Sequence, residues 1–146
     1  MEYKGYKCKV QLVRENPEKY NEAIKIGQSD DVYELVKEIE NLNQEVVLII
    51  SLDMSSKVIG INEIAKGGAN GAGITAKEAF IPVLLSGGSR CIMVHNHPSG
   101  ESKPSNSDLM MTRRIKEAGK VIGVDLLDHV IVGYNNHFSF SSERLI

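Results

Sequence analysis

Residues 94–108 read VHNHPSGESKPSNSD, and this stretch indicates a strand, a loop and the start of a helix in immediate succession. The mostly apolar residues 90–94 predict a buried strand that runs into the histidines. Pro98 ends the strand, because a proline cannot donate a hydrogen bond to a strand ladder. After a polar loop, a helix is predicted from Asn106 to about Lys120. This succession of elements is typical of an α/β fold.

Two histidines and one acidic residue in this stretch form a candidate metal site. His95 and His97 are two residues apart, so on a strand their side chains point to the same face. Asp108, in the first turn of the predicted helix, can return a carboxylate to the same point. Two neutral imidazoles and a carboxylate are a zinc ligand set that leaves a fourth position open for water. Zinc makes that water acidic near neutral pH and polarises a carbonyl group, so the pattern favours catalytic zinc over structural zinc.

The same acidic residue has a second interpretation. Ser105 and Asp108 have the spacing of a capping box, in which each side chain binds the backbone N–H of the other at a helix start. Glu or Gln is the usual partner of the serine. The capping and metal-binding interpretations are compatible, and the sequence leaves both open.

The whole chain, residues 1–146, is predicted to form one α/β domain without an internal repeat or a linker. Further helices are predicted over about 30–42 and 75–85, and strands over 46–52, 58–64, 126–132 and 137–141. Residues 1–28 are interpreted as an N-terminal arm, in which the alternation of polar and apolar residues at 6–12 indicates an edge strand. The core is expected over about 29–142.

Composition excludes several classes of protein. A length of 146 residues suits a single domain, and 42% hydrophobic and 25% charged residues are ordinary for a globular protein. A net charge of −2 and an aromatic content of 5% argue against a general nucleic-acid binder. The basic cluster of the chain, at residues 113–120, is explained by a solvated helix face, with contact to an anion or a nucleic acid as the alternative.

Cysteine usage and apolar runs bear on the compartment. Cys8 and Cys91 are too far apart for a Cys-x-x-Cys metal pair, and the N-terminus lacks the apolar core of a signal peptide. The longest apolar run, residues 46–50, is far shorter than the ~20 residues of a membrane span. The sequence therefore predicts a soluble, cytoplasmic protein with both thiols free and no association with a membrane.

The spacing His-x-His, seven residues, Ser, two residues, Asp resembles the signature of the JAMM (JAB1/MPN+) metalloproteases. The sequence around this signature is most similar to the RadC-like branch of that family. The resemblance runs from about residue 30 to 140, and its matching segments are HNHPSG (95–100), PS (104–105), Asp108, TRR (112–114) and LLDHVIVG (126–133). The resemblance implies a single JAB1/MPN-type domain, a three-layer fold similar to cytidine deaminase, with a mixed β-sheet flanked by helices.

The resemblance also implies a function: a zinc-dependent peptidase or isopeptidase in which His95, His97 and Asp108 bind Zn²⁺. Glu45, just before the first buried strand, matches the position of the general base. Glu63 is the runner-up for that role. Ser105 would donate a hydrogen bond to the developing oxyanion.

Several questions stay open at the sequence level. The peptide or isopeptide substrate has no identifying feature, and a homodimer is left open. One alternative function is a RadC-type module associated with DNA repair, and another is a metal-binding scaffold without turnover. RadC-like proteins usually carry a helix-hairpin-helix-like region before this domain, and residues 1–29 do not resemble one. This difference weighs against a role on DNA.

Four other features have simpler interpretations. Cys91 shares strand parity with His95, and a small buried apolar residue explains it better than a fourth zinc ligand. His129 is interpreted as a structural histidine, with a supporting contact to a metal ligand as the alternative. His137 is expected at the surface or in a hairpin. Gly67–Gly73 lacks a phosphate-binding pattern and is expected to form a mobile lip over the cleft.

Overall fold

The structure is a computed structural model that describes residues 24–67 and 73–146. The strand expected at 6–12 lies outside the described residues, and so does most of the glycine-rich segment 67–73. Among the residues that are described, no helix is both long enough and apolar enough to cross a membrane.

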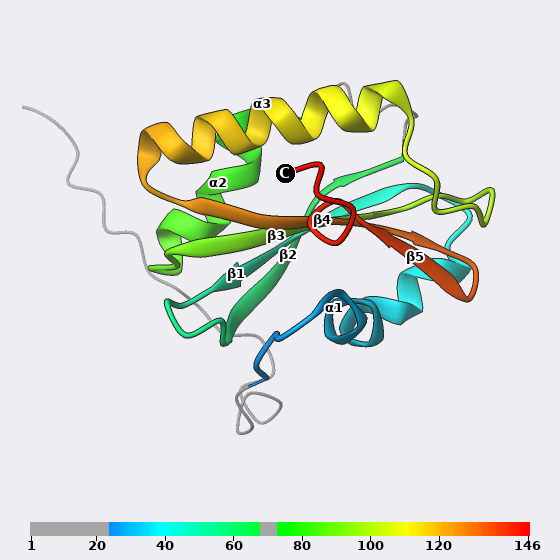
Figure 1. Ribbon diagram of the computed structural model, residues 1–146, viewed down its shortest axis with the longest axis horizontal. Helices are drawn as coiled ribbons and strands as arrows, with labels where there is room; N and C mark the ends of the chain where they lie inside the picture. The colour runs from blue at the N-terminus through cyan, green and yellow to red at the C-terminus, as the bar shows by residue number, and fades with distance from the viewer. Residues whose placement is uncertain (1–23, 68–72) are drawn as a thin grey trace, which may run out of the picture.

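Five strands form one mixed sheet with helices on both faces (Figure 1). The strand order is β2-β1-β3-β4-β5, in which β3 and β4 run parallel and every other neighbouring pair is antiparallel. The strands are β1 (Val46–Leu52), β2 (Val58–Lys66), β3 (Arg90–Asn96), β4 (Asp125–Gly133) and β5 (Asn136–Ser139).

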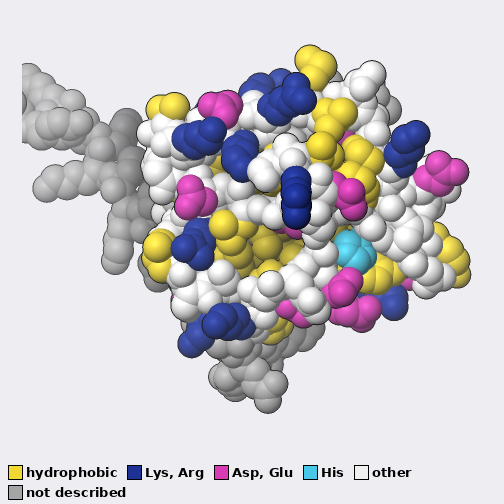
Figure 2. Space-filling view, in the orientation of Figure 1, with side chains coloured by type: hydrophobic (Ala, Val, Ile, Leu, Met, Phe, Trp, Pro, Cys, Tyr) yellow, Lys and Arg dark blue, Asp and Glu magenta, His cyan; other side chains and the backbone are white. Residues whose placement is uncertain are grey.

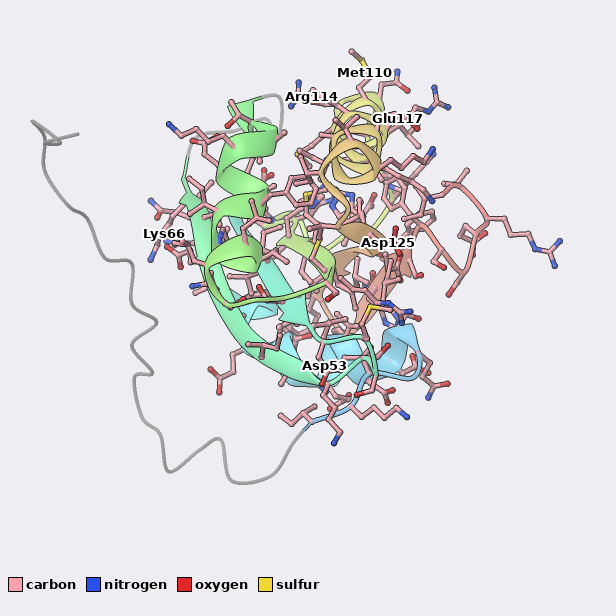
Figure 3. All side chains as sticks on the ribbon, turned by 90° about the vertical axis from the view of Figure 1, so that its left-hand side faces the viewer. Asp53, Lys66, Met110, Arg114, Glu117 and Asp125 are labelled. Carbon is pink, nitrogen blue, oxygen red and sulfur yellow. The ribbon has the colours of Figure 1, made fainter. Side chains whose placement is uncertain are left out.

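Helices cover both faces of this sheet. One face is covered by α1 (Ser29–Val36) and the short 3₁₀ helix η2 (Lys37–Asn41), and the other by α2 (Ala76–Leu85) and α3 (Asn106–Ile122) (Figures 1 and 3). The predicted fold class, a single α/β domain with a mixed sheet between helical layers, is confirmed.

The structure corrects two of the predicted boundaries. The helix expected at 30–42 is α-helical only to Val36 and continues as η2, where the Tyr33 hydroxyl donates to Glu40 Oε2 at 2.6 Å. Strand β3 continues past Val94, because His95 pairs with β1 and Asn96 with β4. Strand length here depends on the neighbouring strands, which local sequence does not specify.

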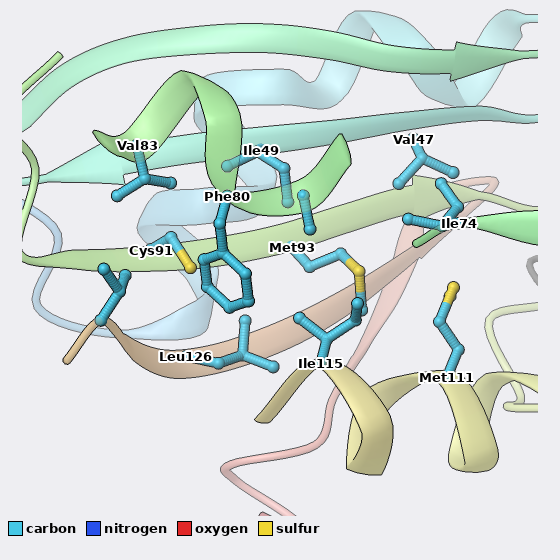
Figure 4. Close-up of a cluster of buried hydrophobic side chains, with 12 residues drawn as sticks. Val47, Ile49, Ile74, Phe80, Val83, Cys91, Met93, Met111, Ile115 and Leu126 are labelled. Carbon is cyan, nitrogen blue, oxygen red and sulfur yellow. The ribbon is translucent and has the colours of Figure 1, made fainter. Parts of the chain in front are cut away.

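Strands β1 and β3 place alternate side chains in two separate cores. Every residue of β1 is buried, as expected for a central strand covered on both faces. Val47, Ile49, Cys91 and Met93 face α2 and α3 (Figure 4). Leu48, Ile50, Leu52, Ile92 and Val94 face α1. This alternation decides which side of the sheet each functional side chain can reach.

Helix α3 offers a matched pair of substitutions to test the packing. Ile115 is fully buried against the sheet, and Val121, on the same helix, is 87% exposed. We expect Ile115→Ala to lower the free energy of unfolding by about 2–5 kcal/mol, because it leaves a cavity. Val121→Ala should change that free energy by less than about 0.5 kcal/mol. Urea unfolding measures both, and equal effects would contradict the assigned packing of α3.

Candidate metal centre

The ends of β3 and α3 bring the candidate ligands together. His95 lies at the carboxyl end of β3, and the backbone N–H of His97 donates to Val132 O of β4 at 2.9 Å. This bond continues the parallel pairing one residue beyond β3. The chain then returns as α3, whose first turn carries Asp108 over the same edge of the sheet. The end of β3 and the first turn of α3 thus hold three polar side chains at one point.

The three side chains have the spacing of a metal site. His95 Nε2 lies 3.0 Å from His97 Nε2 and 3.2 Å from Asp108 Oδ1, and His97 Nε2 lies 3.4 Å from Asp108 Oδ2. A tetrahedral Zn²⁺ holds its ligand atoms at about 2.0–2.2 Å and therefore about 3.4 Å from one another. His95 and Asp108 are buried, and His97 is partly exposed. The group could hold a metal ion with one side toward solvent.

Electrostatics within the cluster favours a charged carboxylate. Burial alone would raise the pKa of Asp108, but hydrogen bonds from His95, His97 and the Ser105 backbone hold that pKa well below its usual range. The hydrogen bond to Asp108 raises the pKa of His97, and burial opposes this rise. A carboxylate that stays ionised inside the protein needs a positive partner, and a protonated histidine or a metal ion can be that partner.

The orientation of the His97 ring follows from its other contact. His97 Nδ1 lies 2.8 Å from the carbonyl oxygen of Glu101. A carbonyl only accepts hydrogen bonds, so Nδ1 carries the proton. The Nε2 atom of His97 therefore faces the cluster.

The capping box predicted from Ser105 and Asp108 is present. The Ser105 hydroxyl accepts from the Asp108 backbone N–H at 3.1 Å, and Asp108 Oδ2 accepts from the Ser105 backbone N–H at 2.7 Å. The Ser105 hydroxyl also donates to Asp108 Oδ2 at 2.7 Å. The same carboxylate caps α3 and faces the histidines, so the two interpretations of this pair are compatible. The serine holds the carboxylate in place.

Glu45 precedes β1 at the same edge of the sheet and is partly buried. Asn96, between the two histidines, holds the two residues that flank Glu45. Asn96 Oδ1 accepts from the Val46 N–H at 2.7 Å, and Asn96 Nδ2 donates to Gln44 O at 3.1 Å. The charge of Glu45 contributes to the raised pKa of His97. Glu45 therefore acts electrostatically on a residue of the cluster.

Glu63 lies on the other face of the sheet. It pairs with Leu48, which packs in the core beneath α1, whereas His95 pairs with Val47 in the core beneath α3. Residues directly opposite each other in adjacent strands share a face. A shift in register between Val47 and Leu48 contributes to this placement, and no local pattern in the sequence indicates that shift.

Cys91 and His137 lie outside the candidate cluster. Cys91 is buried in the core, as predicted, and burial raises the pKa of its thiol to about 12. It lies four residues before His95 on β3, about 13 Å along a strand, which is too far for a ligand. His137 lies in β5 and stacks on Tyr33 with ring centroids 5.0 Å apart.

His129 lies closer to the candidate site than its interpretation as a purely structural histidine implies. It is fully buried, and its Nε2 lies 2.7 Å from His95 Nδ1. Burial, followed by the charge of His95, holds the pKa of His129 well below its usual range. The structure therefore has the alternative arrangement, in which His129 contacts the candidate ligand His95. Thr112, whose Oγ1 lies 2.6 Å from His129 Nδ1, belongs to the matching TRR segment, but the sequence assigns it no role.

Comparison with known proteins agrees with this geometry. The chain matches the family model described as "RadC-like JAB domain" over residues 26–145. The chain belongs to the RadC-like JAB domain family. The resemblance seen in the His-x-His segment is thereby confirmed, and the RadC-like JAB domain accounts for most of the chain.

Curated relatives of this RadC-like chain are longer. A "UPF0758 protein" of Clostridium perfringens is 40% identical over 124 residues, which cover 84% of this chain and 55% of the relative. A "UPF0758 protein" of Thermotoga maritima is 39% identical over 127 residues, which cover 87% of this chain and 54% of the relative. The chain thus spans about half the length of these relatives.

The contact between Asn96 and the Glu45 segment can be tested by hydrogen exchange. Asn96→Ala leaves the buried N–H of Val46 without its acceptor, at a cost of about 1–3 kcal/mol. We expect exchange at Val46 to become roughly tenfold faster or more, while the amide of Ile50, in the middle of β1, stays protected. NMR measures both amides, and an unchanged rate at Val46 would show that Asn96 does not hold this segment.

Proposed function

We propose that this RadC-like JAB domain is a zinc-dependent hydrolase of amide bonds, acting on a peptide or an isopeptide. The observation that carries the proposal is the convergence of His95, His97 and Asp108, with ligand-atom separations of 3.0–3.4 Å at a partly exposed edge of the sheet. Three protein ligands with an open side are the arrangement of catalytic zinc sites.

The donor set supports zinc in particular. Two imidazole nitrogens and one carboxylate oxygen suit Zn²⁺ better than Mg²⁺ or Ca²⁺, which prefer oxygen ligands. His95 Nε2, His97 Nε2 and a carboxylate oxygen of Asp108 would hold the ion. When bound, zinc would polarise the substrate carbonyl and make a water molecule nucleophilic near neutral pH.

The chain's own residues would orient the reactants and move the proton. We assign the role of general base to Glu45, whose carboxylate accepts a proton from the attacking water and passes it to the leaving amine nitrogen. Asn96 holds the backbone on both sides of Glu45, at Gln44 and Val46, and the Gly67 N–H donates to Glu45 O at 2.8 Å. A fixed backbone limits where the carboxylate can move.

Ser105 would have two roles. Its hydroxyl orients Asp108 through the capping box. For the predicted contact with a developing oxyanion, this hydroxyl would turn away from Asp108 and donate to the substrate oxygen. The backbone N–H of Ser105, at 2.7 Å from Asp108 Oδ2, would keep the carboxylate in place during this exchange.

The charge distribution weighs against the alternative of a DNA-bound module. Of the basic cluster on α3, Arg114 donates to Ile74 O at 2.6 Å and Lys120 pairs with Glu117 at 2.7 Å. Figure 2 shows Lys and Arg scattered over one face of the molecule with acidic side chains among them.

A cytoplasmic location suits the free, buried thiol of Cys91, and we propose it on that ground.

Metal analysis tests the site directly. We expect about one Zn²⁺ per chain in the wild-type protein, measured by mass spectrometry of the metal after dialysis. His97→Ala and Asp108→Asn should lower zinc affinity by more than the roughly 10–100-fold that loss of a supporting residue costs. His137→Ala, a histidine outside the cluster, is the control and should bind as wild type does. A wild-type protein that takes up no zinc would overturn the proposal.

The two glutamates can be compared as bases. Glu45→Gln should keep its zinc and lower amide hydrolysis by roughly 10²–10⁴-fold, because the proton acceptor is lost. Glu63→Gln should leave both unchanged, because Glu63 lies on the other face of the sheet. The assay is release of new amino termini from a mixed library of peptides and lysine isopeptides, followed by mass spectrometry. Equal activity of Glu45→Gln and wild type would remove Glu45 from the mechanism.

A further inference from the structure

A line of buried polar groups runs from the backbone of one candidate ligand to the ring of another. The Thr112 hydroxyl lies 2.6 Å from the backbone oxygen of Asp108 and 2.6 Å from His129 Nδ1. His129 Nε2 then lies 2.7 Å from His95 Nδ1. Thr112, His129 and His95 are almost entirely buried, with exposed fractions of 1%, 0% and 0%. Water therefore has little access to these groups, and each proton must go to a neighbour in the line.

The position of every proton in this line follows from its first member. The backbone oxygen of Asp108 only accepts, so the Thr112 hydroxyl donates its single proton there. Thr112 Oγ1 must then accept from His129, which places the proton of the neutral His129 ring on Nδ1. The Nε2 atom of His129 is left as an acceptor, and it accepts from His95 Nδ1. We propose that Thr112 and His129 are positioning residues that fix His95 as a metal ligand through Nε2.

The consequence for the metal centre is specific. With Nδ1 protonated in both rings, His95 and His97 direct their Nε2 atoms toward each other and toward Asp108. Lone pairs and a carboxylate at 3.0–3.4 Å repel one another unless a proton or a cation lies between them. The line of hydrogen bonds would thus prepare the three ligand atoms before the ion arrives, and it lowers the cost of ordering them on binding.

The two residues come from elements that hold them rigidly. Thr112 lies on α3, one turn after Asp108, and its side chain is bonded to the carbonyl four residues earlier. His129 lies on β4 and stacks on Phe140, with ring centroids 4.7 Å apart. The line thus connects the backbone of Asp108 to the far side of the His95 ring, in addition to the direct contact between the two side chains. The positioning role of Thr112 and His129 depends on the proposed zinc site and does not depend on hydrolysis.

Thr112 permits a nearly isosteric test. Thr112→Val removes the hydroxyl and keeps the shape of the side chain, whereas Thr112→Ser keeps the hydroxyl. We expect Thr112→Val to lower Zn²⁺ affinity by roughly 10–100-fold and Thr112→Ser to bind as wild type does, measured by competition with a chromophoric chelator. Ser51→Ala removes another buried hydroxyl, one without a partner among the described residues, and is the control. Thermal unfolding of the metal-free variants separates a loss of stability from a loss of affinity.

A second measurement reads the protons without any metal. Nitrogen-15 NMR of the histidine rings in the metal-free wild-type protein should show His129 protonated at Nδ1 and His95 carrying a proton at Nδ1. A His129 ring protonated at Nε2 alone would overturn the proposal, and so would equal zinc affinities of Thr112→Val and wild type. If both measurements agree with the proposal and no amide is hydrolysed, the positioning role stands and the hydrolase function fails.

Discussion

A carboxylate that stays charged inside a protein needs compensation, and Asp108 is the group on which the rest of this site depends. It is only 3% exposed, and its pKa is nevertheless held well below the usual range of an aspartate. Ser105 and the first turn of α3 supply neutral hydrogen-bond donors. The remaining compensation comes from the Nε2 atoms of His95 and His97, which face the carboxylate. Each can donate a hydrogen bond to it when protonated, or can bind a metal ion shared with it. The cost of burying the charge is thus offset only when the strand and the helix meet at this edge.

The sheet order explains why one strand can support so much chemistry. Strand β3 lies between β1 and β4, and each neighbour contributes to the candidate centre on a different side. From β1 comes the Glu45 segment, which Asn96 binds at Val46 and Gln44. From β4 comes His129, which contacts His95. Helices α1 and α3 cover the two faces with apolar cores, so the polar groups between them have few alternatives to their observed partners.

The RadC-like JAB domain matched by this chain contains the complete candidate centre within residues 45–129. The chain spans about half the length of the curated relatives reported above. Every residue to which we assign a role in the proposed chemistry lies within the residues that match this domain. A substrate would reach it from the side on which His97 is partly exposed.

Most of the fold and the three candidate ligands could be predicted from local patterns. A strand places His95 and His97 on one face, and the capping spacing places Asp108 in the first turn of a helix, whatever the rest of the chain does. Glu63 and His129 could not be placed in this way, because their surroundings depend on register. A shift between Val47 and Leu48 sends Glu63 to the α1 face, and the pairing of β3 with β4 brings His129 to His95. Register is set by packing on both faces of the sheet at once, so only the tertiary structure decides which groups support the ligands that the sequence already names.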